Sequence, residues 1–118
     1  EELASYTTYK TEDCDTLLIS FGISSRACYG AVDLGRSKGA KMGLLNLTTL
    51  WPFPNHVIYK FAQKVKKMIV VEMNMGQMVH KVAEYSQDLC EVKFVGLIGG
   101  EIPTPEYIIY EARARLEI

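Results

Sequence analysis

Short apolar runs recur along the chain and alternate with segments in which apolar residues have helical spacing. Such runs are typical of strands buried on both faces, as in a mostly parallel sheet between helix layers. The first predicted strand, Ser5–Lys10, differs because it is rich in tyrosine and threonine and has the composition of an edge strand. We predict strands at Ser5–Lys10, Thr16–Phe21, Met42–Leu47, Met68–Val71 and Glu91–Val95.

A helix is expected after each of the last four strands. The first should begin at Ser24 or Ser25, whose hydroxyl can cap it, and Gly39 should end it in the left-handed conformation. The others should span Asn55–Val65, Gln77–Asp88 and Tyr107–Leu116, the last opening at Thr104-Pro105-Glu106. A strand followed by four strand–helix units predicts a three-layer α/β/α domain with a mostly parallel sheet.

The helical spacing also predicts which residues face the sheet. These are Ala27, Cys28, Ala31, Val32 and Gly35 in the first helix, Val57, Ile58, Phe61, Ala62 and Val65 in the second, and Met78, Val79, Val82 and Ala83 in the third. The small residues of the first helix, with Gly30, predict a close approach between that helix and the sheet.

The stretch Leu44–Pro54 combines a buried strand, a corner with two prolines and a helix start. Pro52 and Pro54 donate no backbone hydrogen bonds and restrict the residues before them, so the corner should be rigid. Trp51 and Phe53 bring two large aromatic surfaces to it. Two interpretations stay open: a corner that fills the core, and an aromatic contact with another domain.

The composition is that of a soluble globular protein, and 118 residues suffice for one domain, residues 1–118. The net charge of −1 argues against nucleic-acid and membrane partners. Because the chain begins with Glu1, we interpret it as a fragment of a longer chain. Cys14, Cys28 and Cys90 are too few and too dispersed for a disulfide framework or a metal site, so we expect a cytoplasmic protein without a metal of its own.

Two loops are candidates for function, because each follows a buried strand and opens a helix. Loops of this kind line a ligand crevice when their strands are neighbours at a topological switch point, and helix starts can hold an anion. The candidate crevice residues are Gly22, Ser24, Ser25, Glu72, Asn74, Gly76 and Gln77. The alternative is that both loops are simply capped turns.

Glu72 stands at the end of an apolar run, where an unpaired carboxylate would be costly. We therefore expect it to accept hydrogen bonds from backbone N–H groups at the next helix start. A role as a catalytic base would require a partner, and we expect His56 and His80 to face solvent. No dinucleotide fingerprint, phosphate-binding loop or nucleophile elbow is present, so no catalytic residue is expected.

Four segments together resemble the C-terminal part of the α subunit of 2-oxoacid:ferredoxin oxidoreductases, most similar to the 2-oxoglutarate and 2-oxoisovalerate types. They are Thr16–Gly22, Lys41–Pro54, Val70–Gln77 and Gly99–Pro105. Leu-Trp-Pro-Phe-Pro and Glu-Met-Asn-Met-Gly-Gln are the specific motifs among them. The resemblance implies a fold like the transketolase C-terminal domain: a five-stranded mixed sheet of order 1-3-2-4-5 with the first strand antiparallel.

The resemblance also implies the chemistry of the whole complex: a 2-oxoacid is decarboxylated on thiamine diphosphate with magnesium, the acyl group passes to coenzyme A, and iron–sulfur clusters carry electrons to ferredoxin. None of these cofactors is expected in this chain, and His56 stands where many relatives have an acid. The chain should then be a non-catalytic assembly domain. Its partners would be the N-terminal domain of the same subunit and the other subunits. The alternatives are a binding module for coenzyme A or another anionic cofactor in the crevice, and an independent enzyme with Glu72 as base.

Overall fold

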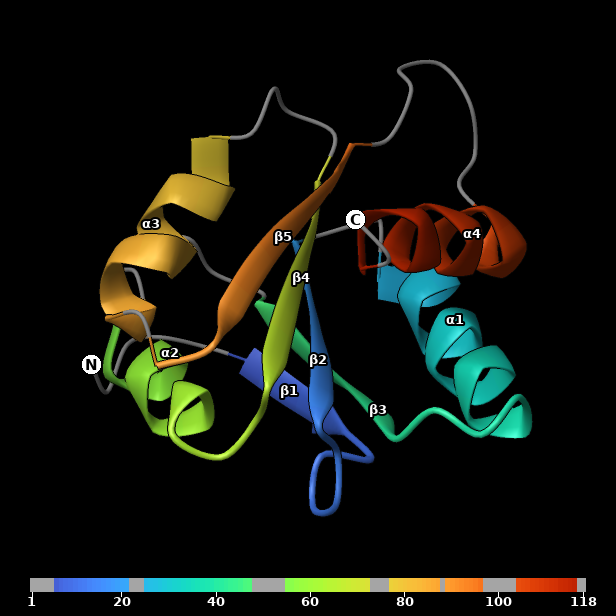
Figure 1. Cartoon of the computed structure of the whole chain (residues 1–118), viewed down its shortest axis with the longest axis horizontal. Helices are drawn as coiled ribbons and strands as arrows, with labels where there is room; N and C mark the ends of the chain where they lie inside the picture. The colour runs from blue at the N-terminus through green and yellow to red at the C-terminus, as the bar shows by residue number, and fades with distance from the viewer. Residues whose placement is uncertain are drawn as a thin grey trace.

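A five-stranded sheet lies between two layers of helices in the computed structural model (Figure 1). The structure describes residues 6–21, 25–47, 55–72, 77–87, 89–96 and 104–116. Its strands are β1 (Tyr6–Tyr9), β2 (Thr16–Phe21), β3 (Met42–Leu47), β4 (Lys67–Glu72) and β5 (Glu91–Gly96). Every strand lies within two residues of its predicted bounds, because each apolar run ends at a polar residue or a glycine.

The strand order is β1-β3-β2-β4-β5. β1 pairs with β3 in the antiparallel direction, and the β2–β3, β2–β4 and β4–β5 pairs are parallel. This confirms both the mostly parallel sheet expected from the apolar runs and the order and direction implied by the family resemblance. The three side chains at the start of β1 are exposed, as expected for an edge strand.

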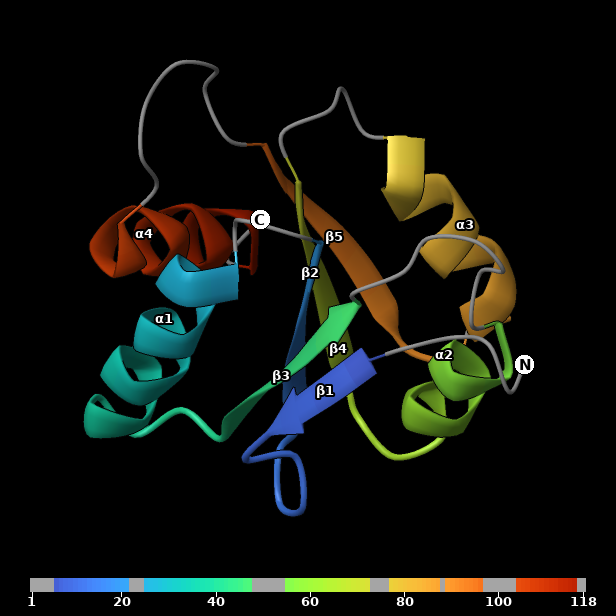
Figure 2. The ribbon, with the colours of Figure 1, turned by 180° about the vertical axis from the view of Figure 1, so that it is seen from behind.

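The helices divide equally between the two faces of the sheet. α1 (Ser25–Ser37) and α4 (Pro105–Leu116) cover one face, whereas α2 (Asn55–Ala62) and α3 (Gln77–Ser86) cover the other, as the view from behind shows (Figure 2). Alternate strand residues supply the two cores: Leu18 and Ile69 pack under α1 and α4, and Leu17 and Val70 pack under α2 and α3.

α1 packs closely because its inner stripe is made of small residues, all of which are buried as predicted. A Cβ at Gly30 would lie 2.6 Å from Cγ of Pro105 at the start of α4. A Cβ at Gly35 would collide with Sδ of Met42 on β3 and approach Ile109 on α4. The close approach expected between helix and sheet is therefore correct at Gly35, while at Gly30 it is an approach to α4 instead.

The helix ends differ from the expected ones in two places. α2 stops at Ala62 rather than Val65, because the chain closes there in a turn with Lys64 N–H donating to the Phe61 carbonyl. α3 stops at Ser86, and its residue Ala83 is exposed rather than buried, so the third inner stripe was partly wrong. Gly39 has the left-handed φ of +96° expected of a helix stop.

The start of α4 is capped as its sequence predicts. Thr104 Oγ1 accepts a hydrogen bond from the Tyr107 backbone N–H at 3.1 Å, and Pro105 is the first helical residue. The Tyr107 hydroxyl then donates to the Gly96 carbonyl at 3.0 Å, which ties α4 to the end of β5.

Candidate functional site

The carboxyl ends of β2 and β4 lie side by side, with Ser20 opposite Val71. β3 lies on the other side of β2, so the chain passes from β3 to β4 across β2, and the sheet has its switch point at this edge. α1 and α3 both begin at this edge, after β2 and β4 respectively (Figure 1). The two candidate loops therefore start from neighbouring strands, as predicted.

The structure places only part of the predicted crevice. Ser25 and Gln77 are the first residues of α1 and α3, and Glu72 is the last residue of β4. The other predicted residues lie outside the part of the chain that the structure describes: Gly22, Ser24, Asn74 and Gly76 of the crevice and Trp51 and Phe53 of the corner. Their roles stay predictions.

Glu72 is buried, with 3% of its surface exposed, although it is ionisable. Its Oε2 accepts a hydrogen bond from the backbone N–H of Val79, the third residue of α3, at 3.1 Å. The first N–H groups of a helix have no partner within the helix, and a carboxylate there also interacts favourably with the helix dipole. Glu72 thus links the end of β4 to the start of α3, which confirms the structural role expected from its position.

A second buried polar group lies at the same edge but on the opposite face of the sheet. Ser20 on β2 and Asn46 on β3 are directly paired in register, and the Ser20 hydroxyl donates to Asn46 Oδ1 at 3.0 Å. Cys28 of α1 packs on Ser20, and burial raises the pKa of its thiol to about 12. Reasoning from the sequence missed this group; the available signal was one polar residue at the penultimate position of each of two apolar strands.

Two ion pairs join the end of α1 to the connection between β1 and β2. Arg36 donates to Asp13 at 2.7 Å and also to the backbone carbonyls of Met42 at 2.7 Å and Lys10 at 2.8 Å. Asp33 accepts from Lys10 Nζ and from the Tyr9 hydroxyl, both at 2.9 Å. The hydrogen bond from Arg36 lowers the pKa of Asp13, and the bonds from Lys10 and Tyr9 lower the pKa of Asp33.

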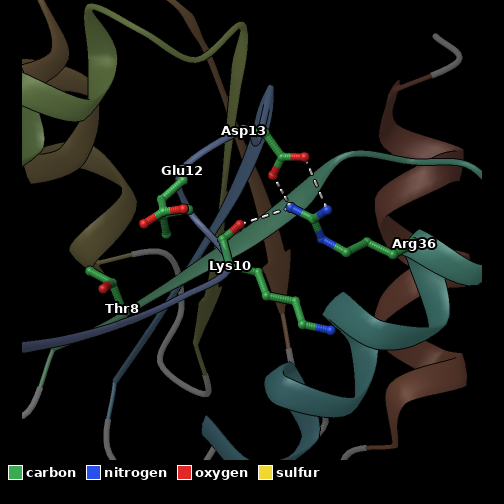
Figure 3. A pocket seen from close by; sticks show the side chains of 6 residues that line it. Thr8, Lys10, Glu12, Asp13 and Arg36 are labelled. Carbon is green, nitrogen blue, oxygen red and sulfur yellow. Dashed lines mark hydrogen bonds and ion pairs between the residues drawn. The ribbon is translucent and has the colours of Figure 1, made fainter.

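Lys10, Asp13 and Arg36 border a polar hollow of about 590 Å³ at the amino-terminal edge of the parallel strands (Figure 3). Its lining residues are Thr8, Lys10, Thr11, Glu12, Asp13 and Arg36. Figure 3 shows the Arg36 guanidinium directed at Asp13 and at the Lys10 carbonyl. The hollow lies at the edge of the sheet opposite to the predicted crevice. Its arginine and lysine are both held in ion pairs within the fold.

The three thiols do not fit an iron–sulfur centre, which needs about four cysteine ligands at one place. Cys28 lies in the core under α1 and α4, whereas Cys14 lies in the core on the other side of the sheet and Cys90 packs against that second core. Across the residues that the structure describes, no three His, Cys, Asp or Glu side chains gather where they would hold a metal ion. His56 and His80 are exposed, as expected.

The family model described as pyruvate:ferredoxin oxidoreductase core domain II matches residues 14–108. The chain belongs to this family. The match spans all four parallel strands, the helices α1 to α3 and the start of α4. It confirms the family resemblance that the sequence motifs indicated.

Curated relatives of this core domain II chain include subunits of the two expected types. The chain is 40% identical over 99 residues to the 2-oxoglutarate synthase subunit KorA of Methanothermobacter marburgensis, covering 84% of this chain and 26% of that one. It is 37% identical over 102 residues to the ketoisovalerate oxidoreductase subunit VorB of the same organism, covering 86% of this chain and 29% of that one. The chain thus spans about a quarter of the length of these relatives.

Two solved structures share the fold. A 2-oxoglutarate:ferredoxin oxidoreductase from Magnetococcus marinus, described with 2-oxoglutarate, coenzyme A and succinyl-CoA bound, superposes with a TM-score of 0.75 at 22% identity, over 95% of this chain and 20% of that one. A split-gene transketolase superposes with a TM-score of 0.76 at 18% identity, over 96% of this chain and 41% of that one. The transketolase-like fold implied by the resemblance is confirmed. Among the described residues, no helix is both long and apolar enough to span a membrane.

Proposed function

We propose that this chain is a non-catalytic assembly domain within the α subunit of a 2-oxoacid:ferredoxin oxidoreductase. The complex would decarboxylate a 2-oxoacid oxidatively, transfer the acyl group to coenzyme A and pass electrons to ferredoxin. The observation that carries this proposal is the core domain II match over residues 14–108, joined to relatives that are named as subunits of such oxidoreductases.

The assembly role is supported by what the charged groups of the domain do. The buried carboxylate Glu72 holds the start of α3, and the exposed pairs Arg36–Asp13 and Lys10–Asp33 tie α1 to the strand connection. Each of these groups stabilises a junction between elements, including Lys10, Asp13 and Arg36, which line the polar hollow while they are held in ion pairs. We propose that thiamine diphosphate, magnesium and the iron–sulfur clusters are held by the remainder of the subunit and by its partner subunits, and that the complex is cytoplasmic.

The proposal is tested by comparing the 118-residue chain with the assembled enzyme. Both are assayed for reduction of ferredoxin that depends on coenzyme A, with 2-oxoglutarate and 2-oxoisovalerate as substrates and with thiamine diphosphate and magnesium present. We expect the chain alone to give no turnover and the complex to be active. Turnover by the chain alone would overturn the assembly role.

The aromatic corner is the proposed contact with the rest of the enzyme, because its flanking prolines leave little to order on binding. In the full-length subunit, we expect Trp51→Ala to weaken association with the other domains and subunits while the domain keeps its stability. Phe53→Ala is the matched variant two residues away. A loss of about 3–5 kcal/mol in the stability of the domain, with association unchanged, would show that Trp51 belongs to the core instead.

The alternative is a binding site for coenzyme A or another anionic cofactor at the switch-point edge. It is favoured by the two helix starts, Ser25 and Gln77, that follow neighbouring parallel strands there. Calorimetric titration of the chain with coenzyme A, with pantetheine as the phosphate-free control, separates the two functions. Binding of coenzyme A but not of pantetheine would support the alternative, and absence of binding at millimolar coenzyme A would exclude it.

A further inference from the structure

β2 and β3 form a pair whose register is poorly specified by their hydrophobic pattern. Both strands are apolar on both faces over most of their length, with Leu17–Ile19 in one and Leu44–Leu45 in the other completely buried. A slip by two residues keeps every side chain on its own face of the sheet, so it would again place apolar residues beside apolar residues. The hydrophobic effect by itself therefore distinguishes weakly between such registers.

Ser20 and Asn46 interrupt this uniform pattern at one level of the sheet. They are register partners, 0% and 8% exposed, and the Ser20 hydroxyl donates to Asn46 Oδ1. A slip of two residues in one direction would place Leu44 beside Ser20, and a slip in the other direction would place Leu18 beside Asn46. Either slip separates a buried hydroxyl from a buried amide. This shifts the equilibrium between the two registers toward the observed one by about 5- to 150-fold for each polar group left unpaired.

We propose that the Ser20–Asn46 pair sets the register of β2 against β3 at the carboxyl edge of the sheet. Cys28 of α1 contacts Ser20, so the pair also touches the helix that covers this face of the sheet. Gly43 acts at the other end of β3, where a Cβ would lie 2.8 Å from the Lys10 carbonyl oxygen. Gly43 limits the register by steric exclusion against the β1–β2 connection, whereas the buried pair selects it inside the sheet.

The register matters because it determines how the two strands end relative to one another. A slip of two residues would move the end of β3 by about 6.5 Å along the end of β2. The connection after β2 carries Gly22 and Ser24 of the predicted crevice, and the connection after β3 carries the aromatic corner. The pair thus positions that edge whatever binds there, and its role does not depend on which proposed function is correct.

The test uses the 118-residue chain with the pair removed and with the pair exchanged. Ser20→Ala/Asn46→Leu replaces both polar groups by apolar ones, and Ser20→Asn/Asn46→Ser keeps the pair with its members exchanged between the strands. The two single substitutions, Ser20→Ala and Asn46→Leu, complete a double-mutant cycle. Amide NMR spectra and native-state hydrogen exchange report on β2 and β3, and urea unfolding reports on global stability.

We expect each single variant to unfold at lower urea than the apolar double variant, because only the singles bury one member of the Ser20–Asn46 pair without the other. The double variant should nevertheless show more than one set of amide signals in β2 and β3, or exchange there at least tenfold faster than the wild type. The exchanged variant should keep one set of signals and wild-type protection.

A double variant with one set of signals and wild-type protection would overturn the proposal. If the double variant does not fold, the exchanged variant decides. Native spectra for the exchanged variant would then support the pair as the determinant of register. Loss of the fold in the exchanged variant as well would show that the shape of each position, not the pair, is what the sheet requires.

Discussion

Removal of the Glu72 carboxylate should destabilise the domain through the start of α3. The side chain is almost fully buried, and its Oε2 lies 3.1 Å from the backbone nitrogen of Val79. The Val79 N–H lies in the first turn of α3, where the helix itself offers no backbone acceptor. In Glu72→Ala this N–H loses the acceptor that the carboxylate provides. Leaving one member of a partly buried hydrogen-bonded pair without its partner costs about 1–3 kcal/mol, so we expect the free energy of unfolding to fall by an amount in this range.

Urea denaturation followed by circular dichroism measures this loss as a shift in midpoint at constant slope. Glu84→Ala is the matched control, because Glu84 is an exposed glutamate on the same helix, and it should change stability by less than about 0.5 kcal/mol. Glu72→Gln keeps an acceptor oxygen without the charge and should fall between the wild type and Glu72→Ala. If Glu72→Ala matched Glu84→Ala, the anchoring role derived from the geometry would be refuted.

Two further predictions concern packing and charge. Gly35→Ala should lose about 1–3 kcal/mol of stability in the same urea experiment, because its Cβ would collide with Met42. A loss smaller than about 0.5 kcal/mol would contradict the close packing of α1. Stability should also fall as the pH drops below about 4, because the pKa values of Asp13 and Asp33 are lower in the folded protein than the value of 3.8 in the unfolded chain. The stabilisation from these two ionised carboxylates is complete above pH 3.8 and is lost as the pH falls through their folded pKa values. The free energy of unfolding of the wild type and of Asp13→Asn/Asp33→Asn is measured at pH 6 and pH 3. If the variant lost as much stability between these two pH values as the wild type does, other groups would cause the acid loss.

The candidate site was only partly predictable from the sequence. Burial of Glu72 and its bond to the next helix start follow from one local fact, a carboxylate at the end of an apolar strand before a helix. The sequence alone pointed to backbone donors at the next helix start, and the structure identifies the N–H of Val79, two residues after the first residue of α3, as one of them. Such a choice depends on the angle between β4 and α3, which no local pattern contains.

The bonds that join distant parts of the chain were missed for a related reason. Ser20 and Asn46 are 26 residues apart, and Asp13 and Arg36 are 23 apart. A serine in a strand or an arginine at a helix end is ordinary in isolation. Only the register of β2 with β3, and the direction in which α1 crosses the sheet, bring these side chains within hydrogen-bonding distance.

The type and order of the secondary-structure elements and the three-layer class follow from local sequence patterns. Apolar runs, helical stripes and glycine stops are local, and each depends on burial or backbone freedom over a few residues. Three outcomes follow only from the packing of the layers: Ala83 is exposed, Ser20 and Asn46 are buried, and Gly30 meets α4 rather than the sheet. These outcomes depend on how layers pack against each other, because the burial of a side chain depends on neighbours that are distant in the sequence and adjacent in space.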